Sequence, residues 1–148
     1  MAGGRLTIDL GALAANYRRL AALSAPAETA AVVKADAYGL GIEHAVPALA
    51  AAGSRTFFVA YPAEGLAARA AAPDARVFVL SGPMGEQSAG VIAEAGLIPV
   101  LNSVDDIALW RRVSGGRAAL HVDTGMNRLG VSESEAAVFA AENAGGET

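Results

Sequence analysis

Short runs of apolar, β-branched residues alternate with longer alanine-rich segments along almost the whole chain. The short runs predict strands at residues 5–9, 29–34, 56–60, 76–80, 97–101 and 118–123. The segments between them carry apolar side chains at helical spacing, which predicts helices at residues 10–23, 43–52, 63–72, 87–94 and 103–113. Strands that alternate with helices are typical of an α/β fold with a parallel sheet.

The last predicted helix runs from about Ser132 to about Asn143. Ser132 is followed three positions later by Glu135, which is the sequence signature of a capping box. Turn-forming residues follow each predicted helix and no linker interrupts the pattern, so residues 1–148 are expected to form one domain. A closed (β/α)8 barrel needs eight strands, and this pattern supplies about five βα units after its first strand. The pattern therefore fits either an open sheet or part of a barrel.

Composition narrows the class of protein. Of the 148 residues, 53% are hydrophobic and 18% are charged, which is unlike a disordered chain. The absence of cysteine excludes disulfides, thiolate metal sites and a cysteine nucleophile. A net charge of −4 offers no basic surface for nucleic acid or an anionic membrane. No segment has the length of a membrane span or of a signal-peptide core, so a cytoplasmic location is expected.

Lys34 is the first candidate for chemistry. Strand alternation puts Val32 and Lys34 on one face, so Lys34 would project from the carboxyl end of a buried strand, where α/β active sites lie. A lysine partly removed from water loses its proton more easily and can act as a nucleophile or base. The alternative is that Lys34 only marks the exit of the strand into solvent. Gly39 and Gly41 also suit close approach of the backbone to an anion.

Residues 39–44 partly match a dinucleotide-binding fingerprint. The sixth position holds His44, where the fingerprint requires a small residue for close helix packing. Dinucleotide binding is therefore a minor alternative. His44 also has no second credible ligand near it in the sequence, and no metal site is expected.

A second polar segment follows the predicted strand at residues 118–123. Strand alternation puts His121 and Asp123 on one face, and Arg128 follows in the next loop. These polar groups would gather at one rim of the sheet. The alternative is structural, because an inward histidine is often a hydrogen-bonded core residue and Asp-Thr-Gly is a common turn.

Taken together, these segments resemble the alanine racemase family, fold-type III enzymes that use pyridoxal 5′-phosphate (PLP). The family's lysine motif is matched at residues 32–41, VVKADAYGLG, and its second motif at residues 123–130, DTGMNRLG. Residues 8–13 and 16–17 also resemble the start of the family. The resemblance covers essentially all 148 residues.

The resemblance implies an incomplete (β/α)8 TIM-type barrel with about five βα units, preceded by an N-terminal strand and helix. It implies an isomerase that interconverts L- and D-alanine, supplies D-alanine for peptidoglycan, and acts as a homodimer when full length. Lys34 would bind PLP covalently and act as the base that faces the D-alanine proton. Tyr38 would hydrogen-bond the cofactor phosphate, and Arg128 would lie near the phenolic oxygen of PLP and the substrate.

The chain departs from the family pattern at two positions and in extent. Leu40 stands where the family usually has histidine, and His121 stands where many members carry a carbamylated lysine that positions the arginine. His121 is therefore expected to orient Arg128 and not to contact the ligand itself. The resemblance does not extend to the family's C-terminal β domain, which supplies an opposing tyrosine base, so residues 1–148 are expected to lack that base. The chain alone is thus expected not to be a competent racemase; a non-catalytic PLP-binding module and an inactive truncated product are the alternatives.

Overall fold

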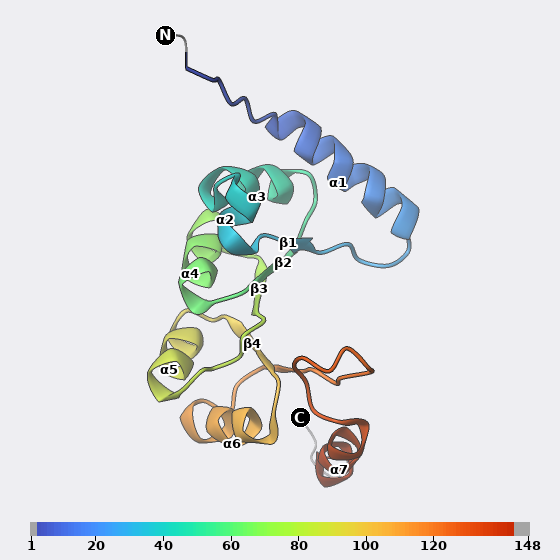
Figure 1. Ribbon diagram of the computed structural model, residues 1–148, viewed down its shortest axis with the longest axis vertical. Coiled ribbons are helices and arrows are strands. Elements are labelled where there is room, and N and C mark those ends of the chain that lie inside the picture. Colours follow the sequence, from blue (N-terminus) through green and yellow to red (C-terminus); the bar gives the residue numbers. More distant parts are fainter. Residues whose placement is uncertain (1–2, 144–148) are drawn as a thin grey trace. The chain divides into compact units, whose positions relative to one another are not determined.

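The computed structural model describes residues 3–143, and their helices alternate with short strands (Figure 1). The chain forms two compact units, Met1–Phe78 and Val79–Thr148. The predicted α/β class is confirmed by this alternation and by the parallel pairing of the strands within each unit.

The first unit is built around two paired strands and the helices that pack on them. Its elements are α1 (Leu10–Ser24), β1 (Ala31–Val32), α2 (Lys34–Gly39), α3 (Ile42–Ala51), β2 (Thr56–Val59), α4 (Pro62–Ala71) and β3 (Arg76–Val79). The last residue of β3, Val79, is counted with the second unit. β1 and β2 pair in parallel, with Ala31 opposite Phe57 and Val32 opposite Phe58. The rings of Phe58 and Phe78 stack with their centroids 4.9 Å apart.

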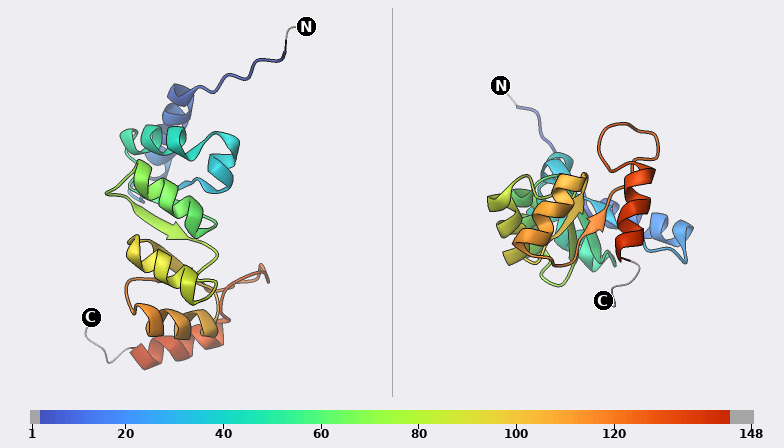
Figure 2. Two further views of the ribbon diagram at one scale, coloured as in Figure 1. Left: turned by 90° about the vertical axis from the view of Figure 1, so that its left-hand side faces the viewer. Right: turned by 90° about the horizontal axis from the view of Figure 1, so that it is seen from below.

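Helix α3 is central to the packing of this unit because it contacts both α1 and α4 (Figure 2). Its apolar side chains are spaced at three and four residues, so they share one face, and Val46 on that face is completely buried. Phe57 and Val59 from β2 are also completely buried. The first core therefore lies between the helices and one face of the strands.

The second unit repeats the same arrangement. Its elements are α5 (Glu86–Glu94), β4 (Ile98–Leu101), α6 (Val104–Val113), β5 (Ala119–Leu120) and α7 (Glu133–Asn143). β4 and β5 pair in parallel, with Leu101 opposite Leu120, and α5 packs against α6. Trp110 on α6 is buried, and its indole Nε1 donates a hydrogen bond of 2.8 Å to the carbonyl oxygen of Gly116.

The helix cap predicted from the sequence is present. The backbone N–H of Ser132 donates to the Glu135 carboxylate at 2.7 Å, and the N–H of Glu135 donates to the Ser132 hydroxyl at 3.2 Å. This reciprocal pair is the predicted capping box of α7. The Ser103 hydroxyl likewise accepts from the N–H of Asp106 at the start of α6. Residues 144–148, which follow the predicted end of this helix, lie outside the described residues.

Three predicted strands differ from the structure. Residues 5–9 form no strand, and Leu6 is 85% exposed there, so the prediction of an N-terminal strand is wrong. A strand requires a paired neighbour, and an apolar run alone does not supply one. The strands predicted at 29–34 and 118–123 are shortened to β1 and β5, although Val122 still forms an isolated bridge with Val131.

Candidate functional site

Lys34 is the first residue of α2, two positions past the end of β1. The prediction that it ends the strand is therefore wrong. Val33 still pairs with the neighbouring strand through its N–H, which donates to the carbonyl oxygen of Phe58 at 2.8 Å, but its ψ of 22° ends the extended backbone. Lys34 nonetheless follows the carboxyl end of β1 and is half-buried.

The backbone after Lys34 forms a left-handed turn. Ala35, Asp36, Ala37 and Tyr38 all have φ between 52° and 55°, a region that L-residues with a Cβ rarely occupy. Each such residue costs about 1–2 kcal/mol relative to the right-handed conformation. Four consecutive residues in this conformation therefore need hydrogen bonds that join the turn to its surroundings.

Two carboxylates supply those hydrogen bonds. Glu64 Oε1 accepts from the N–H of Ala35 at 2.6 Å, at the entry of the turn. Asp36 Oδ1 accepts from the N–H of Ile42 at 2.8 Å, at its exit. Hydrogen bonds to a charged acceptor are about twice as strong as neutral ones, so both ends of the turn are fixed to the rest of the unit.

Tyr38 is the last of the four left-handed residues that follow Lys34. Its side chain is 63% exposed, so the phenol is free to meet a ligand from solvent. The next residue, Gly39, has a φ of 85°, and a Cβ added there would meet no heavy atom within 4 Å. The structure thus brings Lys34 and Tyr38 together on one turn, with open space beside it.

Lys34 is the only lysine in the chain, which otherwise carries ten arginines as its basic side chains. The guanidinium of arginine is not deprotonated in proteins, so Lys34 bears the only side-chain amine that can act as a nucleophile. A residue count alone supplies this signal. It separates Lys34 from every other basic residue before any motif is considered.

His121 lies directly after β5 and is hydrogen-bonded to a buried amide. Its Nδ1 is 2.8 Å from Oδ1 of Asn102, a residue at the carboxyl end of β4 that is 8% exposed. Asn102 Nδ2 donates to the carbonyl oxygens of Leu80 at 2.9 Å and Val100 at 3.0 Å. Sequence reasoning missed Asn102, although a polar residue directly after a predicted strand is a signal that could have found it.

Arg128 lies in a loop that Asp123 organises. Asp123 Oδ1 accepts hydrogen bonds from the N–H groups of Gly125 at 2.9 Å, Met126 at 2.8 Å and Asn127 at 3.1 Å. These N–H donors, that of Gly125 foremost, hold the pKa of the Asp123 carboxyl below its ordinary value. The predicted second polar segment is therefore an ordered loop in the second unit, with the Arg128 side chain exposed.

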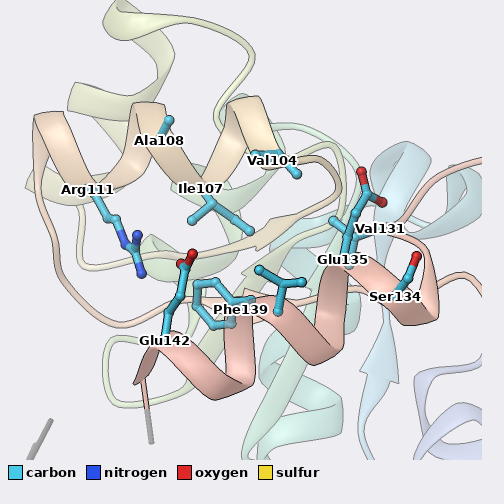
Figure 3. Close-up of a pocket in the computed structure, with 10 residues that line it drawn as sticks. Val104, Ile107, Ala108, Arg111, Val131, Ser134, Glu135, Phe139 and Glu142 are labelled. Atoms are coloured by element: carbon cyan, nitrogen blue, oxygen red, sulfur yellow. The ribbon is translucent and has the colours of Figure 1, made fainter. Parts of the chain in front are cut away.

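A separate groove of about 340 Å³ lies between α6 and α7 (Figure 3). It is lined mainly by apolar side chains, and the guanidinium of Arg111 lies 5.2 Å from the ring centroid of Phe139 at one end. None of Lys34, Tyr38, His121 and Arg128 lines it. The groove is thus distinct from the residues that the sequence motifs select.

Two further kinds of feature are absent from residues 3–143. No group of three or more histidine or acidic side chains is arranged to hold a metal ion within that range. None of the helices described there is long and apolar enough to cross a membrane.

Comparison with known protein families identifies the family of this chain. A family model described as the N-terminal domain of alanine racemase matches residues 8–146. This chain belongs to the alanine racemase family. The resemblance seen in the two motifs is thereby confirmed over nearly the whole chain.

Relatives in bacteria share much of the sequence. Alanine racemase from Methylobacterium sp. (strain 4-46) is 57% identical over 144 residues, which are 93% of this chain and 39% of the relative. Alanine racemase from Rhizobium meliloti (strain 1021) is 48% identical over 143 residues, 94% of this chain and 38% of the relative. The chain therefore spans less than half the length of the curated relatives it matches.

Solved structures agree with the fold. The alanine racemase from Bartonella henselae, with covalently bound pyridoxal phosphate, is 41% identical with a TM-score of 0.82, over 90% of this chain and 39% of that one. The biosynthetic alanine racemase from Pseudomonas aeruginosa is 26% identical with a TM-score of 0.87, over 94% of this chain and 39% of that one. The predicted fold, a partial TIM-type barrel, is confirmed.

Proposed function

We propose that this chain carries the lysine side of an alanine racemase active site. Lys34 would bind PLP covalently and act as the base that faces the α-hydrogen of D-alanine. The observation that carries the proposal is that the chain's only lysine is half-buried after a strand end, within the family's lysine motif. The whole-protein activity proposed with it is interconversion of L- and D-alanine by a cytoplasmic homodimer that supplies D-alanine for peptidoglycan.

The residues at the turn fit a phosphate-bearing aldehyde. Lys34 offers the amine that such a group requires, and Tyr38 offers an exposed hydroxyl that can donate to a phosphate oxygen. No heavy atom lies within 4 Å of a Cβ added at Gly39, so nothing blocks the approach of a ligand at that point. The Bartonella henselae relative, which holds covalently bound pyridoxal phosphate, supports the same assignment.

Lys34 and Tyr38 then have different tasks. PLP, when bound, supplies the electron sink that stabilises negative charge at the α-carbon of the amino acid. The Lys34 amine, once free, accepts the α-proton of D-alanine and can return it to the same face. Tyr38 anchors the phosphate.

Arg128 and His121 are proposed to act together on the ligand. Arg128 carries a positive charge at every relevant pH and would bind the phenolic oxygen of PLP and the substrate. His121, held by Asn102, would orient Arg128 in place of the family's carbamylated lysine. Neutral imidazole supplies no negative charge, so His121 can only offer Arg128 a hydrogen-bond acceptor.

The test is stereospecific exchange of the α-hydrogen. In D₂O with PLP, the chain is expected to introduce deuterium into D-alanine faster than into L-alanine, without net racemisation, because Lys34 supplies one base on one face. Lys34→Arg keeps the charge and removes the usable amine, so it should reduce exchange to the rate of PLP alone. Absent exchange, a preference for L-alanine, or full exchange in Lys34→Arg would each contradict the proposal. Proton NMR of the α-hydrogen provides the measurement.

A further inference from the structure

The Lys34 amine lies at the end of a long, flexible side chain. The main chain at Lys34 therefore determines the position from which the amine can reach a ligand. The residues that follow it, Ala35 to Tyr38, adopt a left-handed turn without a single glycine among them. Such a turn is disfavoured for each of its residues and persists only when its surroundings hold it. Whatever holds the turn therefore also fixes the place of Lys34.

The carboxylate of Glu64, near the start of α4, holds the first residue of this turn in place. One carboxylate oxygen, Oε1, accepts from the N–H of Ala35, the residue directly after Lys34, at 2.6 Å. The other oxygen, Oε2, accepts from the N–H of Ala60 at 2.7 Å and of Tyr61 at 3.1 Å. One side chain thus joins the segment that follows β1 to the segment that follows β2.

These contacts exceed what a helix cap requires. A glutamate at the third position of a helix commonly accepts from the N–H of the N-cap residue, here Tyr61, and this local bond stabilises the helix start. The bond to Ala35 spans 29 positions in sequence and contributes nothing to the helix cap. Its effect is on the turn that carries Lys34.

We propose that Glu64 is a positioning residue for Lys34: its carboxylate fixes the main chain after Lys34 so that the amine meets PLP in one orientation. This inference rests on the proposed function, in which Lys34 binds PLP. Fixing the main chain leaves only the side-chain torsions of Lys34 to be ordered when the cofactor binds, which lowers the entropic cost of binding.

The experiment measures covalent labelling of Lys34 as a function of PLP concentration. In the labelled product, Lys34 Nζ is joined to the aldehyde carbon, the aldehyde oxygen leaves as water, and borohydride adds hydride to fix the bond. Wild type is compared with Glu64→Ala, Glu64→Gln and the matched control Glu94→Ala, which removes an exposed glutamate from α5. Circular dichroism establishes that each variant is folded.

Glu64→Ala is expected to need at least about tenfold more PLP for half-labelling, the change that one charge-assisted hydrogen bond represents. Glu64→Gln keeps one carbonyl acceptor and should fall between wild type and Glu64→Ala, whereas Glu94→Ala should match wild type. Labelling of Lys34 by formaldehyde and borohydride, which needs no defined orientation, should stay within about twofold in all four proteins. If Glu64→Ala only disrupted the structure, labelling of Lys34 by PLP and by formaldehyde would change to the same extent.

Equal PLP dependence in wild type and Glu64→Ala overturns the inference and leaves the proposed function intact. Absence of Lys34 labelling in wild type overturns the proposed function and this inference with it. Hydrogen exchange of the Ala35 amide checks the cause, since it should be at least about tenfold faster in Glu64→Ala. Unchanged exchange would contradict the role of Glu64. If Glu64→Ala does not fold, Glu64→Gln decides by the same readouts.

Discussion

Oδ1 of Asn102 and Nδ1 of His121 lie 2.8 Å apart, and the rest of the Asn102 amide determines which atom carries the proton. Both hydrogens of Asn102 Nδ2 are directed at main-chain carbonyl oxygens, of Leu80 and Val100, which can only accept. Oδ1 must therefore face His121 and accept, so Nδ1 of His121 is the donor. In the neutral imidazole, Nε2 is then the free acceptor.

His121 is accordingly expected to populate the Nδ1–H tautomer when neutral. Two-bond ¹⁵N–¹H correlation spectra of the imidazole distinguish the tautomers, and a His44→Gln variant assigns the signals because the chain has only two histidines. An Nε2–H tautomer in the folded chain would contradict the hydrogen-bond arrangement around Asn102.

Removing the Asn102 amide should destabilise the second unit. Asn102→Ala leaves the carbonyl oxygens of Leu80 and Val100 and the Nδ1–H of His121 without this partner, in a site that is 8% exposed. The free energy of unfolding is expected to fall by about 2 kcal/mol. Urea denaturation followed by fluorescence of Trp110, the only tryptophan, measures it. Asn16→Ala, at an exposed position of α1, is the control and should cause no loss.

Gly130 is required by the loop that carries Arg128. Its φ is 107°, and an added Cβ would lie 2.8 Å from the nitrogen of Asp123 and 3.1 Å from the carbonyl oxygen of His121. Gly130→Ala is therefore expected to lower the free energy of unfolding by more than about 1 kcal/mol.

Gly90 provides the opposite case for the same substitution. It lies inside α5, and an added Cβ would meet no heavy atom within 4 Å. Gly90→Ala should raise the free energy of unfolding by up to about 1 kcal/mol, because alanine has the higher helix propensity. Thermal unfolding of both variants would show shifts of opposite sign, and equal shifts would contradict the account of Gly130.

Asp123 makes the order of the Arg128 loop depend on pH. The N–H donors of Gly125, Asn127 and Met126 lower the pKa of Asp123 in the folded chain, so the ionised form favours folding. This stabilisation is fully present above the unfolded pKa of about 3.9 and is lost as pH falls through the lower folded pKa. The stability difference between wild type and Asp123→Ala should therefore be constant at neutral pH and shrink in acid. A difference that grows in acid would contradict the hydrogen bonding.

The sequence predicted most of the regular structure because local patterns encode it. The start of α7 was predicted from the spacing of Ser132 and Glu135, and their reciprocal hydrogen bonds confirm it. The strand expected at residues 5–9 failed because pairing depends on a partner elsewhere, which no local pattern reveals.

The turn after Lys34 could not be predicted for a different reason. Ala35, Asp36, Ala37 and Tyr38 have no intrinsic preference for positive φ, and the turn depends on Glu64, which lies far along the sequence. The motif identified Lys34 as the candidate for covalent binding of PLP. Its surroundings, including Glu64 and Asn102, required the three-dimensional structure.

The most direct test of the account is the position at which PLP becomes attached. After incubation with PLP and reduction with borohydride, cleavage at arginine yields residues 20–55 with Lys34 inside, and residues 1–5 with the α-amine, the only other amine in the chain. Mass spectrometry should find the label saturably on residues 20–55 and lose it in Lys34→Arg. A label confined to residues 1–5, or equal labelling of residues 20–55 in folded and urea-unfolded protein, would contradict a PLP site at Lys34.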